Sequence, residues 1–371
     1  MTTLPGRIRS ALANLAIASA SLALALVAAE FVFRWVNSDE VFMLPRFITG
    51  AQYGSYQIRS NVPGANYVHT TPDGRWEYRI NARGQRDDRE YEYAKPAGVV
   101  RVLALGDSFT LGFEVGQAES YPAILARALA RRGQNVEVIN AGVSGFSNAE
   151  ALVYLREEGL RYSPDFVVLG FFVNDPTDNV RAGLYRMDDG RLVEHSRKYL
   201  PAIGIRDLLN SFALYRWLSE HSYIHNYLNA KATVFVRDWL AARNARAASE
   251  AEQLEPGEDY ARDLTRALIA EIGASARAAG ARFILMNIPS PSLESNLPIS
   301  PGEMAGFADD YLDMRALLQE YAGLAALYRP HGFEHWTEFS HLLAGLALAR
   351  IVHGPDGTPP ARIDLTEPRS D

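Results

Sequence analysis

VLALGDSFTLGFEV, at residues 102–115, begins as an apolar run and ends in small polar residues. Residues 102–106 have the composition of a buried strand, and Asp107 and Ser108 follow it directly. Open α/β sheets bind their ligands outside the carboxyl ends of the strands, where a strand leads into a helix. The stretch therefore predicts a buried strand that ends in a functional site with a serine hydroxyl.

Strand-like and helix-like segments alternate around and after this stretch. We expect strands at 99–105, 135–141, 165–172 and 281–288, and helices at 119–132, 147–161, 259–279 and 337–353. Near-continuous apolar strands joined by helices indicate a parallel sheet that is covered on both faces. We predict an α/β fold, a three-layer doubly wound parallel sheet, with an N-terminal transmembrane helix and a helical insertion.

Composition limits the classes of function. The 371 residues are 48% hydrophobic and carry a net charge of −7, so the chain can build a large core and has no basic footprint for nucleic acid. It contains no cysteine, which excludes disulfides, thiolate metal sites and a cysteine nucleophile.

The N-terminus has the pattern of a membrane anchor. Arg7 and Arg9 precede the uncharged run 11–29, whose length as a helix is about 28 Å, close to the hydrocarbon thickness of a bilayer. Positive charge before the run predicts a single pass through the cytoplasmic membrane, with the rest of the chain on the outer, periplasmic or extracytoplasmic, side. The alternative is a cleaved signal peptide, since Val27-Ala28-Ala29 resembles a cleavage site.

The chain divides into segments of different composition. We assign 1–36 to the cytoplasmic N-terminus and signal-anchor, 37–98 to a strand and turn segment packed on the main domain, 99–354 to the main domain and 355–371 to a tail. Asp73-Gly74 marks a hairpin turn in the second segment. Within the main domain, 176–257 is an insertion that includes a helical run, and a polar linker at 242–258 follows this run. Aromatic residues of that run either pack on the main domain or form a lid or glycan-binding wall; they are Phe212, Tyr215, Tyr223 and Tyr227.

Polar motifs end three of the predicted strands. They are Gly106-Asp107-Ser108, residues 140–145 with the sequence NAGVSG, and Val173-Asn174-Asp175. In a parallel sheet these motifs share one rim. A serine nucleophile needs a base and donors for the oxyanion, and the backbone N–H groups beside Ser108 and Gly145, with the Asn174 amide, are the candidates. Asp107 and Asp175 are candidate supporting residues.

These three motifs resemble the sequence blocks of the SGNH or GDSL hydrolases. GDSFTLGFEV is similar to the first block, INAGVSG to the second and VNDPTDN to the third, and the wider frame of 78–179 resembles the membrane-anchored, exported branch of the family. The resemblance implies the flavodoxin-like fold of that family and no cofactor. It also implies Ser108 as nucleophile and Gly145 and Asn174 as oxyanion donors. Phe172 stands where the family usually has a glycine.

The base is expected near the C-terminus, where His331, His335 and His341 compete. Relatives with a similar ending read Asp-x-x-His, then Trp, then a small polar helix cap, and His335-Trp336-Thr337 matches this order. The resemblance therefore favours His335 on a loop before the last helix. A metal site built from the three histidines is disfavoured, because no compact carboxylate or thiolate set accompanies them.

The orienting acid departs from the family pattern, because Gly332 occupies the position three before His335. Glu334 is the candidate replacement, or a backbone carbonyl holds the ring of a Ser-His dyad. The alternative base pair is His341 with Glu338, which has a similar spacing but lies within the expected helix.

The expected function is that of a membrane-anchored serine esterase acting on acyl esters, with acetyl groups on envelope or secreted glycans as the favoured substrates. If a sugar hydroxyl replaces water, the same Ser-His machinery gives a polysaccharide O-acyltransferase. A non-catalytic glycan-binding or assembly protein is the second alternative. The expected partners are an acylated small-molecule or glycan substrate and the membrane, without nucleic acid; the sequence identifies no partner protein.

Overall fold

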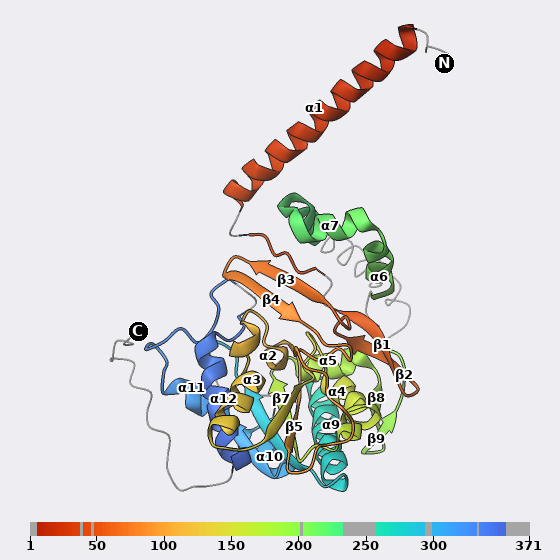
Figure 1. Cartoon of the computed structure of the whole chain (residues 1–371). Coiled ribbons are helices and arrows are strands. Elements are labelled where there is room, and N and C mark those ends of the chain that lie inside the picture. Colours follow the sequence, from red (N-terminus) through yellow and green to blue (C-terminus); the bar gives the residue numbers. More distant parts are fainter. Residues whose placement is uncertain are drawn as a thin grey trace.

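A five-stranded parallel sheet forms the centre of the molecule (Figure 1). The computed structural model describes residues 6–37, 40–45, 48–200, 203–232, 257–293, 299–331 and 334–353. The strand order is β11-β10-β7-β5-β6, the flavodoxin-like order. The strands are β5 (Val100–Leu105), β6 (Val136–Asn140), β7 (Phe166–Phe172), β10 (Arg282–Ile288) and β11 (Asp310–Asp313). The predicted α/β class is confirmed, and β11 is the one strand of this sheet that the sequence pattern did not predict.

The strands form a three-layer core because successive side chains point to opposite faces. In β5, Leu103 and Leu105 join the apolar cluster on one face, and Val102 and Ala104 join the cluster on the other. Helices α4 (Asn148–Glu157) and α9 (Glu258–Ala278) cover the first face, and α3 (Tyr121–Arg131) and α12 (Glu338–His353) cover the second. This double covering explains why the strands read as continuous apolar runs.

The topology creates a crevice at the carboxyl ends of β5 and β7. The chain leaves β5 for β6 on one side and then crosses to β7 on the other side of β5. Ligands bind at such switch points in open α/β sheets. Two short helices begin there, α2 (Ser108–Leu111) after β5 and α5 (Asp175–Ala182) after β7.

Two antiparallel hairpins precede the sheet in the chain. They are β1 (Thr49–Tyr53) with β2 (Tyr56–Ser60), and β3 (Asn66–Thr71) with β4 (Gly74–Arg79). Thr71 pairs with Gly74, so Pro72 and Asp73 form the turn, one residue before the turn that the sequence suggested. Both hairpins lie between the sheet and the N-terminal helix (Figure 1).

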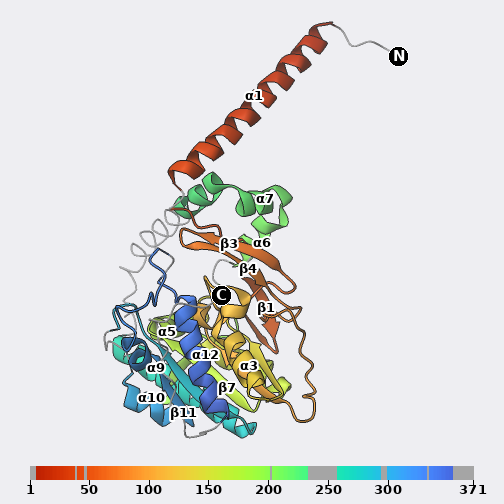
Figure 2. The same ribbon diagram turned by 60° about the vertical axis from the view of Figure 1, so that its left-hand side comes forward.

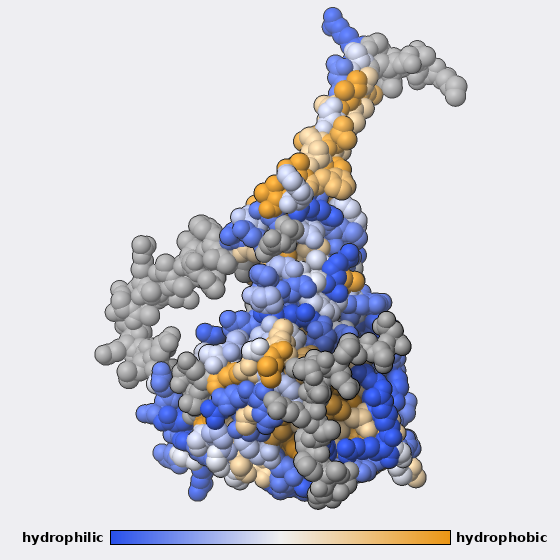
Figure 3. Space-filling model, turned by 90° about the vertical axis from the view of Figure 1, so that its left-hand side faces the viewer, coloured by the Kyte–Doolittle hydropathy of each residue, from blue (hydrophilic) through white to orange (hydrophobic). Residues whose placement is uncertain are grey.

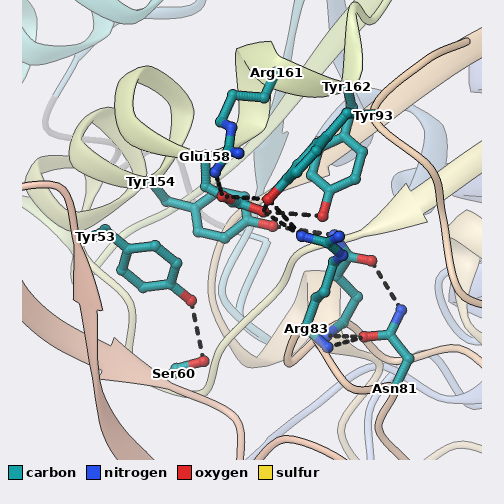
Figure 4. A network of polar contacts seen from close by, with 10 residues as sticks. Tyr53, Ser60, Asn81, Arg83, Tyr93, Tyr154, Glu158, Arg161 and Tyr162 are labelled. Atoms are coloured by element: carbon teal, nitrogen blue, oxygen red, sulfur yellow. Dashed lines mark hydrogen bonds and ion pairs between the residues drawn. The ribbon is translucent and has the colours of Figure 1, made fainter.

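A polar network ties the segment after β4 to the main domain (Figure 4). The Glu158 carboxylate accepts hydrogen bonds from Tyr93 at 2.8 Å and Tyr162 at 3.0 Å, and it pairs with Arg161 at 3.1 Å. Arg83 lies 3.7 Å from the same carboxylate. These contacts connect the segment after β4 to Glu158 at the end of α4.

The insertion after β7 contains a hairpin and helices. The hairpin consists of β8 (Tyr185–Asp188) and β9 (Arg191–Glu194). It is followed by the helices α6 (Ile203–Ser211) and α7 (Ala213–His221) and by a helix at 223–232. Phe212 is exposed, and the predicted polar linker lies outside the described residues except for Gly257 and Glu258. The remaining short elements are the 3₁₀ helices η1 (Gln117–Glu119) and η2 (Gly159–Tyr162) and the helices α10 (Pro301–Phe307) and α11 (Met314–Gln319).

Helix α1 (Gly6–Val36) extends away from the rest of the molecule (Figures 1 and 2). Its apolar segment, Ser10–Val36, has a mean hydropathy of 2.1 and is not buried inside the protein. Figure 3 shows the apolar side chains along this helix above a domain face that is mostly hydrophilic. Length and composition suit a membrane span, although a signal sequence has the same properties. The predicted tail, 355–371, lies outside the described residues.

Candidate active site

Ser108 begins α2 directly after β5. Asp107 caps this helix, since its Oδ1 accepts a hydrogen bond from Phe109 N at 2.9 Å. Gly112 ends the helix in the left-handed region with φ of 83°, which favours glycine. The turn holds the half-buried Ser108 at the rim of the sheet.

His335 lies against this serine although 227 positions separate them in the chain. Its Nε2 is 2.7 Å from Ser108 Oγ, so the hydroxyl can donate to the unprotonated nitrogen. The imidazole is buried and contacts two phenylalanine rings, with centroid distances of 5.0 Å to Phe109 and 4.7 Å to Phe113. The geometry suits proton transfer from the hydroxyl to a ring that is largely removed from water.

Glu114 faces the other nitrogen of the imidazole. Its Oε2 lies 3.8 Å from His335 Nδ1, and its side chain is fully buried. The residue has φ of 62°, which is unusual for a side chain with a Cβ. Burial raises the pKa of Glu114 to about 7. The sequence analysis did not identify this carboxylate, which occupies the place of an orienting acid.

The segment before the sheet builds the loop that carries Glu114. Glu114 N donates to Tyr78 Oη at 2.8 Å, and Arg329 Nη2 donates to the Glu114 carbonyl at 3.1 Å. The buried Arg86 guanidinium donates to the carbonyls of Leu111, Gly112 and Val115 and lies 4.0 Å from the centre of the Tyr78 ring. The bonds of Arg86 to three carbonyls on either side of Glu114 fix the backbone of this loop, and Tyr78 fixes the loop at Glu114 itself.

The second motif packs directly on the first. Val143 N donates to the carbonyl of Gly106 at 3.1 Å. A Cβ at Gly142 would lie 2.2 Å from Leu111 N, so only glycine allows this approach. Gly145 follows with φ of 72°, again in the left-handed region. The Val143 bond and the close approach of Gly142 to Leu111 thus hold the second motif against the turn that carries Ser108.

Arg59 of β2 binds the backbone carbonyl of Gly145. Its guanidinium donates to Gly145 O and pairs with the buried Glu150, to which Nε donates at 2.8 Å. Glu150 in turn accepts from Ser147 N at 3.0 Å in a capping box at the start of α4. The second motif is therefore clamped between β2 and α4.

Asn174 occupies the start of α5 at the end of β7, and its side chain is exposed. Nδ2 donates to Asp178 Oδ2 at 3.0 Å, which uses one of its two hydrogens. The three predicted oxyanion donors therefore stand at the ends of three adjacent strands, β6, β5 and β7. Phe172 does not disturb this order, because its ring packs on Phe109 at 4.7 Å.

Asp107 and Asp175, the predicted supporting residues, are both buried. Asp175 Oδ2 accepts from Phe172 N at 2.9 Å and from Asn148 Nδ2 at 3.1 Å. Burial raises the pKa of Asp107 to about 7, and burial together with Asp107 raises the pKa of Asp175 well above its usual range. These carboxyls brace the backbone under Ser108 and Asn174.

The remaining predicted candidates lie elsewhere. Glu334 is exposed and has φ of 57°. His341 is fully buried, its Nδ1 accepts from Tyr121 N at 3.2 Å, and burial lowers its pKa to about 3. Its predicted partner Glu338 pairs with Arg329 instead. The structure therefore brings His335, and neither Glu334 nor the His341 and Glu338 pair, to Ser108 and Glu114.

His331, the third histidine, bonds to the β3–β4 turn, with Nδ1 2.9 Å from Asp73 Oδ1. Its backbone N donates to the other oxygen of the same carboxylate at 2.9 Å. Within the described parts of the chain, no group of three His, Asp or Glu side chains is arranged to hold a metal ion. The histidines thus occupy three different environments.

Several known proteins are similar to this chain. An arylesterase from Vibrio mimicus is 29% identical over 135 residues, which cover 33% of this chain and 68% of the arylesterase. A lipase/acylhydrolase from Enterococcus faecalis is similar at 16% identity and a TM-score of 0.37, with 68% of this chain and 95% of that chain covered. A catalytic mutant of Axe2, an acetylxylan esterase from Geobacillus stearothermophilus, is similar at 13% identity and a TM-score of 0.39, with 69% and 94% covered.

The decisive match is that of a family model. The model of the GDSL-like lipase/acylhydrolase family matches residues 104–311, more than half of the chain. The matched region begins in β5 and contains all three strand-end motifs. The chain is an ester hydrolase and belongs to the GDSL-like lipase/acylhydrolase family.

Proposed function

We propose that the protein is a membrane-anchored serine esterase whose catalytic domain lies outside the cytoplasmic membrane. The observation that carries the proposal is the 2.7 Å distance between Ser108 Oγ and His335 Nε2. In this proposal Ser108 is the nucleophile, His335 is the base and Glu114 is the orienting acid. The buried Glu114 at 3.8 Å from Nδ1 supports this choice of acid over the exposed Glu334.

The reaction proceeds by acyl transfer to the serine. Ser108 Oγ attacks the ester carbonyl carbon while His335 Nε2 takes the hydroxyl proton, and the Glu114 carboxylate stabilises the imidazolium that forms. The N–H groups of Ser108 and Gly145 and the Asn174 amide hold the oxyanion, and each such donor contributes about 3 kcal/mol in comparable enzymes. His335 returns the proton to the leaving alcohol as the ester C–O bond breaks. Water then attacks the acyl-enzyme by the reverse sequence and releases the carboxylic acid.

The proposed substrates are acyl esters, above all acetyl esters, on envelope or secreted glycans. An exported domain meets such esters on its own side of the membrane, and α1 has the length and hydropathy of an anchor that would keep it there. The acyl-enzyme also explains how a related activity could arise, because a sugar hydroxyl can replace water as the acceptor. Acetate release from an acetylated glycan without added acceptor supports hydrolysis, and release that depends on an acceptor hydroxyl supports O-acyl transfer.

A fluorophosphonate probe tests the nucleophile on the full chain in detergent. The wild type should be labelled, and Ser108→Ala and His335→Ala should lose labelling and the hydrolysis of p-nitrophenyl acetate. Ser196→Ala, a change in the loop after β9, is the matched control and should keep both. Equal labelling of wild type and Ser108→Ala would refute the assignment. A folded wild type that takes no label would instead favour a non-catalytic glycan-binding protein on this fold.

A further inference from the structure

Helices α6 and α7 expose a row of large apolar side chains. We call it the α6–α7 face, and it consists of Ile205, Leu208, Leu209, Phe212, Leu214 and Trp217. Leu214 is 68% exposed and Trp217 is 55% exposed. Large apolar side chains gathered at the surface of a folded protein mark an interaction site. The helices α6 and α7 form one unit, the α6–α7 unit. At its start Ile203 is buried, and α6 packs against β1.

The same helical unit is joined to the end of α1 by charged groups. The Glu30 carboxylate accepts hydrogen bonds from Ser222 Oγ at 2.8 Å and Tyr223 N at 2.6 Å, at the start of the helix 223–232. Arg34 pairs with Glu30 at 2.9 Å and donates to the carbonyl of His221, the last residue of α7.

Aromatic contacts add to this joint between the end of α1 and residues 221–227. The Phe33 ring meets Tyr227 edge-on at 5.2 Å, and Arg34 lies over the Tyr223 ring at 4.9 Å. Tyr223 and Tyr227 therefore contact the anchor helix, where the sequence suggested packing on the main domain or a lid. Figures 1 and 2 both show α7 beside the lower end of α1.

The joint fixes the depth of the unit relative to a membrane. Glu30 directly follows the uncharged run 11–29, which as a helix matches the hydrocarbon thickness of about 30 Å. A carboxylate inside hydrocarbon is costly, so Glu30 marks the level at which the helix leaves it. The α6–α7 unit, bonded to Glu30 and Arg34, must then lie in the zone of the lipid headgroups.

We infer that the α6–α7 face lies on the outer membrane–water interface and that its partner is the lipid bilayer itself. The inference rests on the proposed anchoring by α1. Leucine, isoleucine and phenylalanine side chains suit the boundary between headgroups and acyl chains, and tryptophan is enriched at that level. The helices that carry the α6–α7 face are bonded to the end of the proposed span through Glu30 and Arg34, so the face lies close to the level at which α1 leaves the hydrocarbon.

Site-directed spin labelling tests this in the full chain, which has no native cysteine to remove. Leu208→Cys and Leu214→Cys report on the α6–α7 face, Leu22→Cys on the proposed span and Glu320→Cys on an exposed site at the end of α11. The labelled chains are reconstituted in nanodiscs of phosphatidylcholine and phosphatidylglycerol. Collision with oxygen, which concentrates in lipid, is compared with collision with a water-soluble nickel chelate.

The labels at 208 and 214 should collide with oxygen more and with nickel less than the label at 320. Nickel accessibility equal to that at 320, with the label at 22 in lipid, would overturn the interfacial placement and leave the anchor intact. Labels at 208 and 214 that neither reagent reaches would show that a protein, such as a second copy, covers this face. A label at 22 that behaves like the one at 320 would refute the anchoring itself.

Discussion

Glu114 combines two properties that rarely occur together at a surface crevice. It is a fully buried carboxylate, and its backbone has a positive φ of 62°. Strained backbone at a site persists only where neighbouring groups determine it, and here Tyr78, Arg86 and Arg329 do so. Three side chains from distant parts of the sequence thus hold the backbone that carries Glu114 beside His335.

The first prediction separates the two candidate acids. Glu114→Gln should lower kcat by about 10²–10⁴, because a neutral amide no longer stabilises the imidazolium. Glu334→Gln should leave kcat nearly unchanged, since its side chain points into solvent. Steady-state kinetics on p-nitrophenyl acetate measure both, and circular dichroism checks that each variant is folded. The reverse order of effects would assign the acid to Glu334.

The raised pKa of Glu114 also makes stability depend on pH. An exposed glutamate has a pKa of about 4.3, and burial brings Glu114 to about 7, so the folded chain binds this proton more tightly than the unfolded chain does. The stabilisation from this proton is complete below about pH 4 and is lost as the pH rises through about 7. Glu114→Gln should therefore raise Tm relative to wild type more at pH 8 than at pH 5. Thermal unfolding followed by circular dichroism measures this; an equal Tm difference at the two pH values would contradict it.

The histidines differ in what their loss should cost. His335→Ala should lower kcat by several orders of magnitude and leave folding nearly unchanged, because it removes the base. His341→Ala should act on stability instead, by about 1–3 kcal/mol, because it leaves Tyr121 N without its partner in a buried site. Urea unfolding and kcat on the same preparations distinguish them. An inactive but stable His341→Ala would mean that the base had been misassigned.

At the scale of elements, β2 controls the second motif through Arg59. The Arg59 guanidinium donates to Gly145 O and to the Glu150 carboxylate at the same time. Arg59→Lys keeps the positive charge, but a single ammonium group cannot reproduce both sets of hydrogen bonds. We expect kcat to fall by about 10–10² with a smaller change in KM, since a displaced oxyanion donor acts on the transition state. Arg156→Lys is the matched control, because Arg156 is an exposed residue of α4 that pairs with Glu271 of α9. Unchanged kcat in Arg59→Lys would remove Arg59 from any role in positioning.

The sequence predicted the elements that are buried on both faces. Strands β5, β6, β7 and β10 begin and end within one residue of the predicted apolar runs, because burial on two faces requires continuous apolar residues. The edge strand β11 was missed. Its sequence, DYLD, is half polar and only partly buried, so it carries neither the continuous run nor the clear alternation of a strand.

The site was predictable only where its residues lie in motifs. Ser108, Gly145 and Asn174 were identifiable because each follows a strand. Glu114 was not, because its proximity to His335 depends on a left-handed turn and on the long-range bonds of Arg86. The one feature of the sequence that could have indicated Glu114 is its position within the segment GDSFTLGFEV, six residues after Ser108.

At the scale of the whole molecule, the N-terminal segment joins an apolar helix to the catalytic domain. The full chain should remain with membranes after a carbonate wash, and protease added to spheroplasts should cleave the domain. The reason is the order of Arg7 and Arg9 before a run long enough to span the bilayer. Immunoblotting with a C-terminal tag measures both. A released mature chain that begins near Glu30 would show a cleaved signal peptide instead.

The uneven spacing of the three site residues has a consequence for biosynthesis. Ser108 and Glu114 belong to the same short segment after β5, whereas His335 follows 227 positions after the serine, shortly before α12. In the proposed topology the domain follows the anchor across the membrane, so the proposed nucleophile and acid emerge long before the proposed base. A half-exported chain then holds a serine with no group to take its proton, and the chemistry begins only when the last helix emerges and docks on α3.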